Sequence, residues 1–449
     1  MTRLAWLGCA LVGVTAAGVL LQMSLLGTWP DNRNMFAASM LIAVAVYFAA
    51  ARVSLAGPLP PRALHLVLGT ALALRLLVLF APPLLSGDVF RYVWDGRVQA
   101  AGINPYEHVP ADPALAFLRD AEIYPNINRA DYAPTIYPPA AQVIFAAVGR
   151  VASSVLAVKT AMVGFEILAV LCLLRLLAIA RLPPERVLIY AWNPLAVWEF
   201  AGSGHVDAAA IGLLGAALLL RVLRRDSLAG LVLGAAVLVK FLPLAAAPAF
   251  WRARAGWRTA AGCVLAMAGL YGLYIGAGAK VLGFLPGYRA EEGQVDGSGL
   301  WLLAGLRRLS ELPQAAPTMY FAVAGAALLA LAAWVAFRPR PPAGSPADAI
   351  RVCGDAALLV AALTFVISPH YPWYYVWLAL PAVVAPYWSV IWLSAAPALL
   401  YLSYLDYLDY AFTRPALFFV PALLLLLADL RRGGRAPPVS ISEAVEGRP

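Results

Sequence analysis

The chain carries little charge. Of its 449 residues only 13% are charged and 62% are hydrophobic, whereas a soluble globular domain has roughly 25% charged residues. Apolar runs long enough to span a bilayer, which takes about 20 residues each, recur along the sequence with no hydrophilic block of domain size between them. We therefore expect one integral membrane domain over residues 1–435 and a short, disordered cytoplasmic tail over residues 436–449.

Several motifs are also absent. The four cysteines stand singly in apolar surroundings, without a CxxC pair or metal-ligand spacing, so we interpret them as buried small hydrophobic residues. The sequence has no glycine-rich phosphate loop and no nucleotide-binding βαβ unit, which argues against a nucleotide-bound substrate on the cytoplasmic face. The net charge of +9 comes mostly from arginines at the ends of apolar runs. Membrane topology explains that pattern better than a nucleic-acid partner does.

The apolar runs predict an all-α polytopic membrane protein with about 12–14 transmembrane or half-spanning helices. The first run is expected to be an uncleaved span. The region 187–252 contains Pro194, Gly202, Gly204 and Pro243, and it predicts broken helices of the kind tolerated where protein or a wet cavity satisfies the backbone. The candidate spans are 4–26, 35–56, 63–85, 158–180, 187–203, 206–224, 227–240, 242–252, 258–279, 318–338, 351–369, 371–387, 389–405 and 414–431.

Arginines in the short loops indicate the orientation. Most of them fall on one face, which the positive-inside rule assigns to the cytoplasm together with both termini. The opposite, outer face receives two long polar segments, about 86–157 and 280–317, and most of the acidic residues. Any chemistry is therefore expected on the outer face.

The first long segment opens with SGDVFRYVWDGRVQAAGINPYEH, residues 86–108. A helix over residues 88–101, ended by Gly102, would place five polar side chains within about 60° of one direction. These side chains are Asp88, Arg91, Tyr92, Asp95 and Gln99. The pattern is typical of an amphipathic juxtamembrane helix whose polar stripe turns to a cavity.

Two interpretations of this stripe stay open. In the first, Asp88 only caps the helix, Arg91 and Asp95 form an i,i+4 ion pair, and the stripe faces water. In the second, Asp88 is a carboxylate held ionised beside a cation at the wall of a cavity, where it can act as a general base.

The order of motifs along the chain resembles a known family. An acid at the outer end of an early span is followed by an aromatic helix, the G-x-N-P-Y turn at 102–106, a long loop and Tyr-Pro-Pro at 137–139. WNPLAVWEFAGSGHVDAAAIGLLGAALLL and SPHYPWYYVWLALP continue the series. This order resembles the polyprenyl-phosphate-sugar-dependent glycosyltransferases of the C superfold, and more narrowly family 87 and its bacterial mannosyltransferase relatives, over about residues 63–380.

The resemblance implies an inverting hexosyltransferase of a bacterial-type inner membrane, with mannose the favoured sugar. Polyprenyl phosphate would carry the donor sugar, and a cell-envelope glycan or lipid would accept it on the outer face. In that superfold the acid of the first outer loop is the catalytic base, which implies Asp88. Its carboxylate would take the acceptor proton as the hydroxyl attacks the anomeric carbon. Arg91 has the D-x-x-R spacing of some relatives, and Asp95 is expected to orient Arg91 or to bind the acceptor.

A departing phosphate needs cations or directed N–H donors, and Lys240 and His205 are the candidates. Lys240 follows a short span at its outer end, so snorkelling to the interface is the alternative. His205 stands in a glycine-rich turn before Asp207, where a satisfied structural histidine is the alternative.

Tyr137 and His370 complete the candidate site by resemblance. The prolines after Tyr137 have a simpler explanation as the first residues of a helix. The aromatic residues around His370 also have a simpler explanation, as a belt of aromatic side chains at the membrane interface.

No cofactor is certain from the sequence. The resemblance allows a divalent cation, but the carboxylates show no clustered ligand spacing. The expected partners are membrane lipids, the lipid-linked sugar donor and a glycan or lipid acceptor, without nucleic acid.

A transporter or lipid flippase is the main alternative function, because broken helices and intramembrane charges also mark transport sites. A non-catalytic assembly partner is a further alternative, and it would be indifferent to the loss of Asp88.

Overall fold

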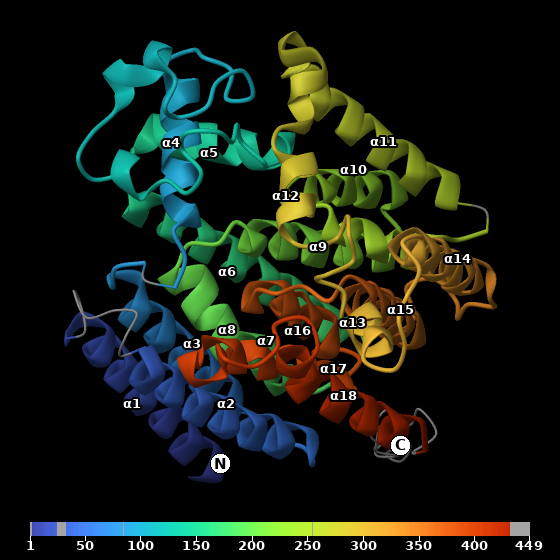
Figure 1. Cartoon of the computed structure of the whole chain (residues 1–449). Helices are drawn as coiled ribbons and strands as arrows, with labels where there is room; N and C mark the ends of the chain where they lie inside the picture. The colour runs from blue at the N-terminus through green and yellow to red at the C-terminus, as the bar shows by residue number, and fades with distance from the viewer. Residues whose placement is uncertain (1, 25–32, 84, 254, 432–449) are drawn as a thin grey trace, which may run out of the picture.

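The computed structural model describes residues 2–24, 33–83, 85–253 and 255–431, which fold into helices and loops without a β-strand (Figure 1). The tail expected at residues 436–449 lies outside the described residues. The α-helices are α1 (Thr2–Ser24), α2 (Arg33–Leu55), α3 (Ala63–Leu79), α4 (Asp88–Ala100), α5 (Pro139–Val151), α6 (Val155–Ile179), α7 (Leu188–Ala191), α8 (Pro194–Ala196), α9 (Asp207–Val222), α10 (Asp226–Val237), α11 (Gly256–Gly272), α12 (Leu285–Glu291), α13 (Trp301–Arg307), α14 (Ala316–Phe337), α15 (Pro346–Ile367), α16 (Ala379–Ala382), α17 (Trp388–Leu393) and α18 (Thr413–Arg431).

The helices confirm an all-α polytopic membrane protein. Within the described residues, six helices are long and apolar enough to cross a membrane, namely α1, α2, α6, α14, α15 and α18. Two bent pairs pass the same test together: Pro194–Gly202 with α9, bent by 117°, and α11 with Ile275–Glu291, bent by 109°. The shorter apolar helices are α3, α5, α10 and Trp388–Tyr401.

The bend before α9 confirms the prediction of broken helices. A π-helical turn, Val197–Gly202, ends there, and the chain reverses at Gly204 with φ +76°. A Cβ atom on Gly204 would lie 3.0 Å from Cγ2 of Val89 and 3.1 Å from Cγ of Lys159. Glycine is needed here because it tolerates the positive φ and leaves room for these neighbours. The close packing brings the turn against the first turn of α4.

The segment predicted as one long outer loop contains the crossed helices α4 and α5. α4 begins at Asp88, where a negative side chain is favoured by the helix dipole. It is followed by Gly102 with φ +78°, as the sequence predicted. The helices touch at Gly96 and Gly149, since a Cβ on Gly96 would lie 2.5 Å from the carbonyl oxygen of Phe145.

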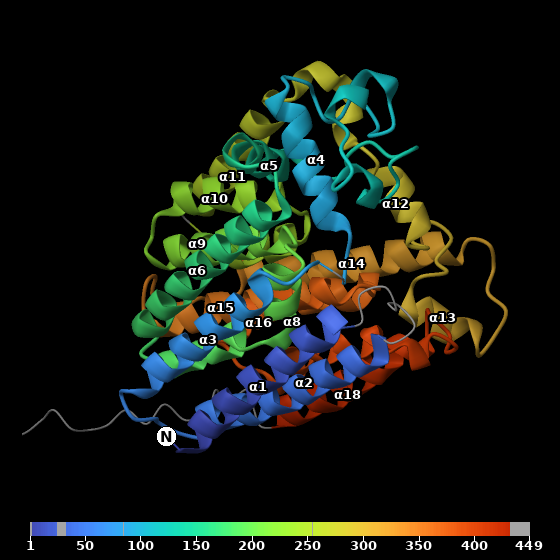
Figure 2. The same cartoon turned by 90° about the vertical axis from the view of Figure 1, so that its left-hand side faces the viewer.

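The two views agree on the arrangement around these helices. α4, α5 and α11 stand on one side of the molecule, α1, α2 and α18 on the opposite side, and α6 and α9 between them (Figures 1 and 2). The N-terminal turn of α4 therefore points toward the middle of the molecule, where the bend before α9 meets it.

Candidate active site

Asp88 lies on the wall of a cavity of about 910 Å³. Its position at the start of α4 leaves its side chain 24% exposed. The hydroxyl of Tyr137 donates to Oδ2 of Asp88 at 3.1 Å, and the backbone N–H of Asp88 donates to Oγ of Ser86 at 3.2 Å. The N-cap residue is Gly87, and Asp88 makes no capping hydrogen bond. The first interpretation of Asp88, a helix cap only, is therefore wrong.

The polar stripe of α4 does not face water. Asp95 is 1% exposed and Arg91 is 8% exposed. The expected i,i+4 pair forms, with Nε of Arg91 2.9 Å from Oδ1 of Asp95. The solvated stripe of the first interpretation is wrong because α5 and the segment before it cover this face. Periodicity showed which side chains share a face, but not what the face meets.

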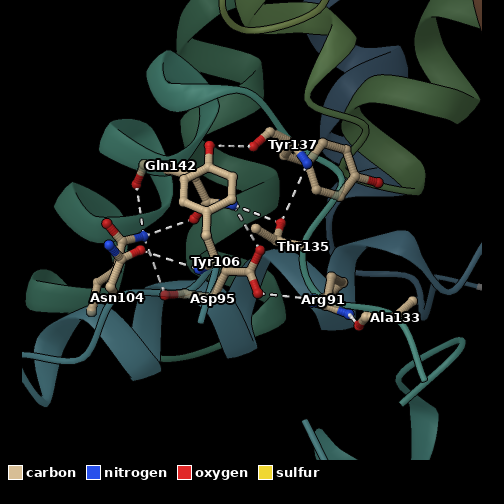
Figure 3. Close-up of polar contacts among 9 residues, drawn as sticks. Arg91, Asp95, Asn104, Tyr106, Ala133, Thr135, Tyr137 and Gln142 are labelled. Carbon is tan, nitrogen blue, oxygen red and sulfur yellow. Dashed lines mark hydrogen bonds and ion pairs between the residues drawn. The ribbon is translucent and has the colours of Figure 1, made fainter. Parts of the chain in front are cut away.

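Arg91 and Asp95 tie α4 to the strand-like segment that carries Tyr137 (Figure 3). Arg91 donates to the carbonyl oxygen of Ala133 at 3.0 Å. Gln142 on α5 donates to Oδ2 of Asp95 at 2.8 Å and approaches Oγ1 of Thr135 equally closely. The placement of Asp95 fits the orienting role, while Arg91 also reaches the cavity wall.

Lys240 lines the same cavity from the end of α10. Its Nζ lies 2.8 Å from Oδ2 of Asp207 and 4.4 Å from the ring centre of Tyr374. Asp207 is fully buried at the start of α9, and its Oδ1 accepts from Nε1 of Trp377 at 2.9 Å. Lys240 therefore points into the protein and does not snorkel to the interface.

His205 is fully buried behind Asp88 and does not line the cavity. Its Nδ1 lies 3.9 Å from Oδ2 of Asp88, and its Nε2 lies 3.3 Å from Oε2 of Glu199. The imidazole stacks on Trp373 with ring centres 4.1 Å apart. Glu199 was not singled out from the sequence, because it lies inside an apolar run and only the fold shows that it faces His205.

His370 lines the cavity and contacts the loop between α12 and α13. Its Nδ1 lies 3.1 Å from Oε2 of Glu292, and its Nε2 lies 2.8 Å from the carbonyl oxygen of Gly299. The structure thus brings Asp88, Arg91, Tyr137, Lys240 and His370 to one cavity, with His205 directly behind Asp88.

Further cations stand around the cavity. Arg129 is paired with Glu291 at 2.6 Å, and Arg414 with Asp406 at 3.2 Å. Arg289 also lines the cavity and makes no ion pair with any residue of the described ranges. Arg289 was missed in the sequence because one arginine in a long loop has no distinguishing pattern.

The charges at the cavity alter the proton affinity of the two central groups. Burial raises the pKa of Asp88 above its ordinary value, although Lys240 and the hydrogen bond from Tyr137 oppose the shift. Burial lowers the pKa of Lys240, but the charge of Asp207 outweighs it and the net pKa lies above the ordinary value. The charge of Asp207 therefore favours the protonated, cationic form of Lys240.

The resemblance allowed a divalent cation. Among the residues that the structure describes, no group of three or more His, Cys, Asp or Glu side chains is placed to hold a metal ion.

The fold and the cavity define a class of protein: an all-α polytopic membrane protein with a carboxylate, a lysine and aromatic side chains around one cavity. The chain belongs to the family described as alpha-(1->6)-mannopyranosyltransferase, N-terminal domain (MptA_B family), whose model matches residues 2–256. No curated protein and no solved structure matches the chain. The protein is thus a membrane mannosyltransferase, and the family favours this enzyme class over the transporter or flippase. The matched range contains Asp88, Tyr137, His205 and Lys240, whereas His370 lies beyond it.

Proposed function

We propose that the protein transfers mannose from a polyprenyl-phosphate donor to a glycan or lipid hydroxyl, with Asp88 as the general base. The observation that carries this proposal is that Asp88 of α4 and Lys240 after α10 line one cavity of about 910 Å³. A displacement at the anomeric carbon needs a base for the acceptor hydroxyl and a cation for the departing phosphate. Asp88 and Lys240 have these two chemistries.

The cavity wall also supports a lipid-linked donor. Leu363 and Ile367, near the end of the apolar helix α15, line the cavity together with Leu400. Such a wall suits a hydrocarbon chain. Nine aromatic side chains line the same space, and the faces of such rings can pack against a sugar. Four of them come from α12 and from the segment that follows His370. They are Tyr288, Tyr371, Trp373 and Tyr374.

In the proposed reaction the acceptor oxygen attacks the anomeric carbon from the side opposite the phosphate. The O–H bond of the acceptor breaks, and its proton goes to Asp88. The bond between the anomeric carbon and the phosphate oxygen breaks, and its electron pair leaves with the phosphate, beside Lys240. This displacement inverts the anomeric centre. The family description names an alpha-(1->6) linkage, so the donor mannose would be β-linked and the acceptor would offer a 6-hydroxyl.

The arginine pattern supports an outer location for the cavity. The short loops rich in arginine are assigned to the cytoplasm, whereas Asp88 follows α3 at the start of a long acidic segment. We place the reaction on the outer face of a bacterial-type inner membrane, with both termini in the cytoplasm.

The test is mannose transfer by purified protein in lipid vesicles. We would offer β-linked polyprenyl-phosphate mannose or a nucleotide mannose, each with a mannoside acceptor, and determine the anomeric configuration of the product by NMR. The proposal expects an α-linked product from the lipid donor alone. Transfer from the nucleotide donor, or a β-linked product, would overturn the proposed donor or the inverting displacement, respectively.

A further inference from the structure

Glu199 and His205 form a buried pair directly behind Asp88. Both side chains are fully buried, and neither ring nitrogen of His205 nor either carboxyl oxygen of Glu199 makes a hydrogen bond within standard limits to any described residue. The nearest polar groups of the imidazole are the two carboxyls, Glu199 at 3.3 Å and Asp88 at 3.9 Å. A buried imidazole without partners is costly. Glu199 lies in the π-helical turn Val197–Gly202, and such turns are frequent at functional sites.

The chemistry of Glu199 and His205 indicates which of the two groups would donate a hydrogen bond to the other. A neutral imidazole donates through one nitrogen and accepts through the other. A buried carboxyl group without other partners is held more readily as a neutral acid than as an anion, so Glu199 can donate to Nε2 of His205. Such a hydrogen bond would place the imidazole proton on Nδ1, the nitrogen nearer to Asp88.

Asp88 would then be held by two donors on the same oxygen. Tyr137 donates to Oδ2 at 3.1 Å, and Nδ1 of His205 lies 3.9 Å from that atom. Catalytic hydrogen bonds are often long in a site without substrate and shorten when it binds. Oδ1 of Asp88 makes no hydrogen bond in the described parts of the chain.

We propose that Glu199 and His205 are positioning residues that fix the carboxylate of Asp88 through Oδ2, so that Oδ1 faces the cavity and takes the acceptor proton. The proposal rests on the proposed function, because it gives a role to groups that act through the base. It assigns to His205 a place other than the leaving phosphate. The imidazole does not line the cavity, whereas Lys240 and Arg289 do.

Other charged groups surround this arrangement and must be kept constant in a test. Lys240 and Asp207 act on Asp88 through their charges, as does Arg129. Trp373 covers the imidazole ring from the cavity side. The variants of His205 must therefore separate the two features, one keeping the stacked ring without the donor and the other keeping a donor without the ring.

The informative variant is His205→Phe, which keeps a ring on Trp373 and removes the donor. Loss of a donor to the carboxylate favours its protonated form, so the acid limb of the kcat profile should move to higher pH. At its optimum kcat should fall about tenfold to a hundredfold, as expected for a lost hydrogen bond to a charged group. The KM for the lipid donor should stay unchanged, because His205 does not line the cavity.

The matched variant His205→Asn tests whether a restored donor rescues the acid limb of the kcat profile. The amide N–H of His205→Asn lies about where Nδ1 does, so this variant should return the acid limb toward that of the wild type. Glu199→Leu, which leaves Nε2 without its donor, should move the acid limb in the same direction as His205→Phe. The measurement is a set of kcat and KM profiles against pH in vesicles, with thermal unfolding recorded for each variant.

The outcomes separate this inference from the proposed function. If Asp88→Asn abolishes transfer while His205→Phe leaves the acid limb unmoved, the positioning role is wrong and the base role stands. A fall in activity of His205→Phe and His205→Asn alike, with matching losses of thermal stability and an unmoved limb, also overturns the positioning role. If Asp88→Asn transfers mannose as the wild type does, the proposed function of Asp88 fails, and this inference fails with it.

Discussion

The Tyr137 hydroxyl donates a hydrogen bond of 3.1 Å to Oδ2 of Asp88. Tyr137 is itself fixed, because the hydroxyl of Tyr106 donates to its carbonyl oxygen at 2.7 Å, and its own N–H donates to Oγ1 of Thr135 at 3.3 Å (Figure 3). The G-x-N-P-Y turn and the Tyr-Pro-Pro run are thus parts of one support for the carboxylate. Tyr137 acts on Asp88 directly from 49 residues further along the chain, and Tyr106 acts through Tyr137.

The raised pKa of Asp88 predicts the pH dependence of the enzyme. Burial raises this pKa, and Lys240 and Tyr137 only partly oppose the shift. A general base works only when it is deprotonated, so kcat should be full above the raised pKa and lost as the pH falls through it. The midpoint of the loss should therefore lie above the ordinary pKa of Asp, about 3.9. Transfer rates in vesicles over a pH series measure this, and a rate that stays flat down to about pH 4 contradicts the prediction.

Tyr137→Phe removes one donor from Asp88 while it keeps the ring. We expect kcat to fall about tenfold to a hundredfold, because hydrogen bonds to charged groups contribute about 1.5–3 kcal/mol. The acid limb should move to higher pH, because the lost donor had favoured the ionised carboxylate. Tyr132→Phe is the matched control. Tyr132 is 58% exposed and bonds Glu291 outside the cavity wall, so this variant should behave like the wild type.

Lys240→Met tests the phosphate cation. Transfer should fall about 100- to 1,000-fold, the usual loss for one group that stabilises developing negative charge. Stability should also fall, by about 3–5 kcal/mol, because Asp207 loses its partner while buried. The double variant Lys240→Met/Asp207→Asn removes that unpaired charge and should regain stability without regaining transfer. Recovery of transfer in the double variant would show that Lys240 serves only the fold.

The orientation predicts which loops an impermeant reagent can reach. In a variant without its native cysteines, Ala121→Cys should react with a membrane-impermeant maleimide on intact cells. Ala343→Cys should react only after the membrane is opened, because it lies in the short arginine-rich loop between α14 and α15. Both positions are exposed. The reverse pattern of labelling would place the cavity on the cytoplasmic face.

Much of the fold was predictable because hydrophobic length and periodicity act locally. The long spans, the amphipathic α4 and its end at Gly102 follow from residues close together in the sequence. The break before α9 follows from the glycine turn at Gly204, whose φ of +76° no straight helix accommodates.

The neighbours of the site residues could not be predicted in this way. The polar stripe of α4 suggested a wet cavity, but Asp95 is buried against Gln142 of α5. Glu199 and Arg289 carry no local signal, because their importance comes only from the residues that the fold places beside them. The ion-pair partner of Lys240 could not be predicted either, because Asp207 belongs to another helix.

The most direct test of the account compares Asp88→Asn with Asp131→Asn. Asp131 is an exposed acid of the same loop and does not line the cavity, so the two variants differ in place but not in chemistry. Both should be purified, shown to unfold at the temperature of the wild type, and supplied with β-linked polyprenyl-phosphate mannose and a mannoside acceptor in vesicles. The account predicts full transfer by Asp131→Asn and a loss of at least about 100-fold by Asp88→Asn, within the range of general base catalysis. Transfer by Asp88→Asn at the rate of the wild type would contradict it.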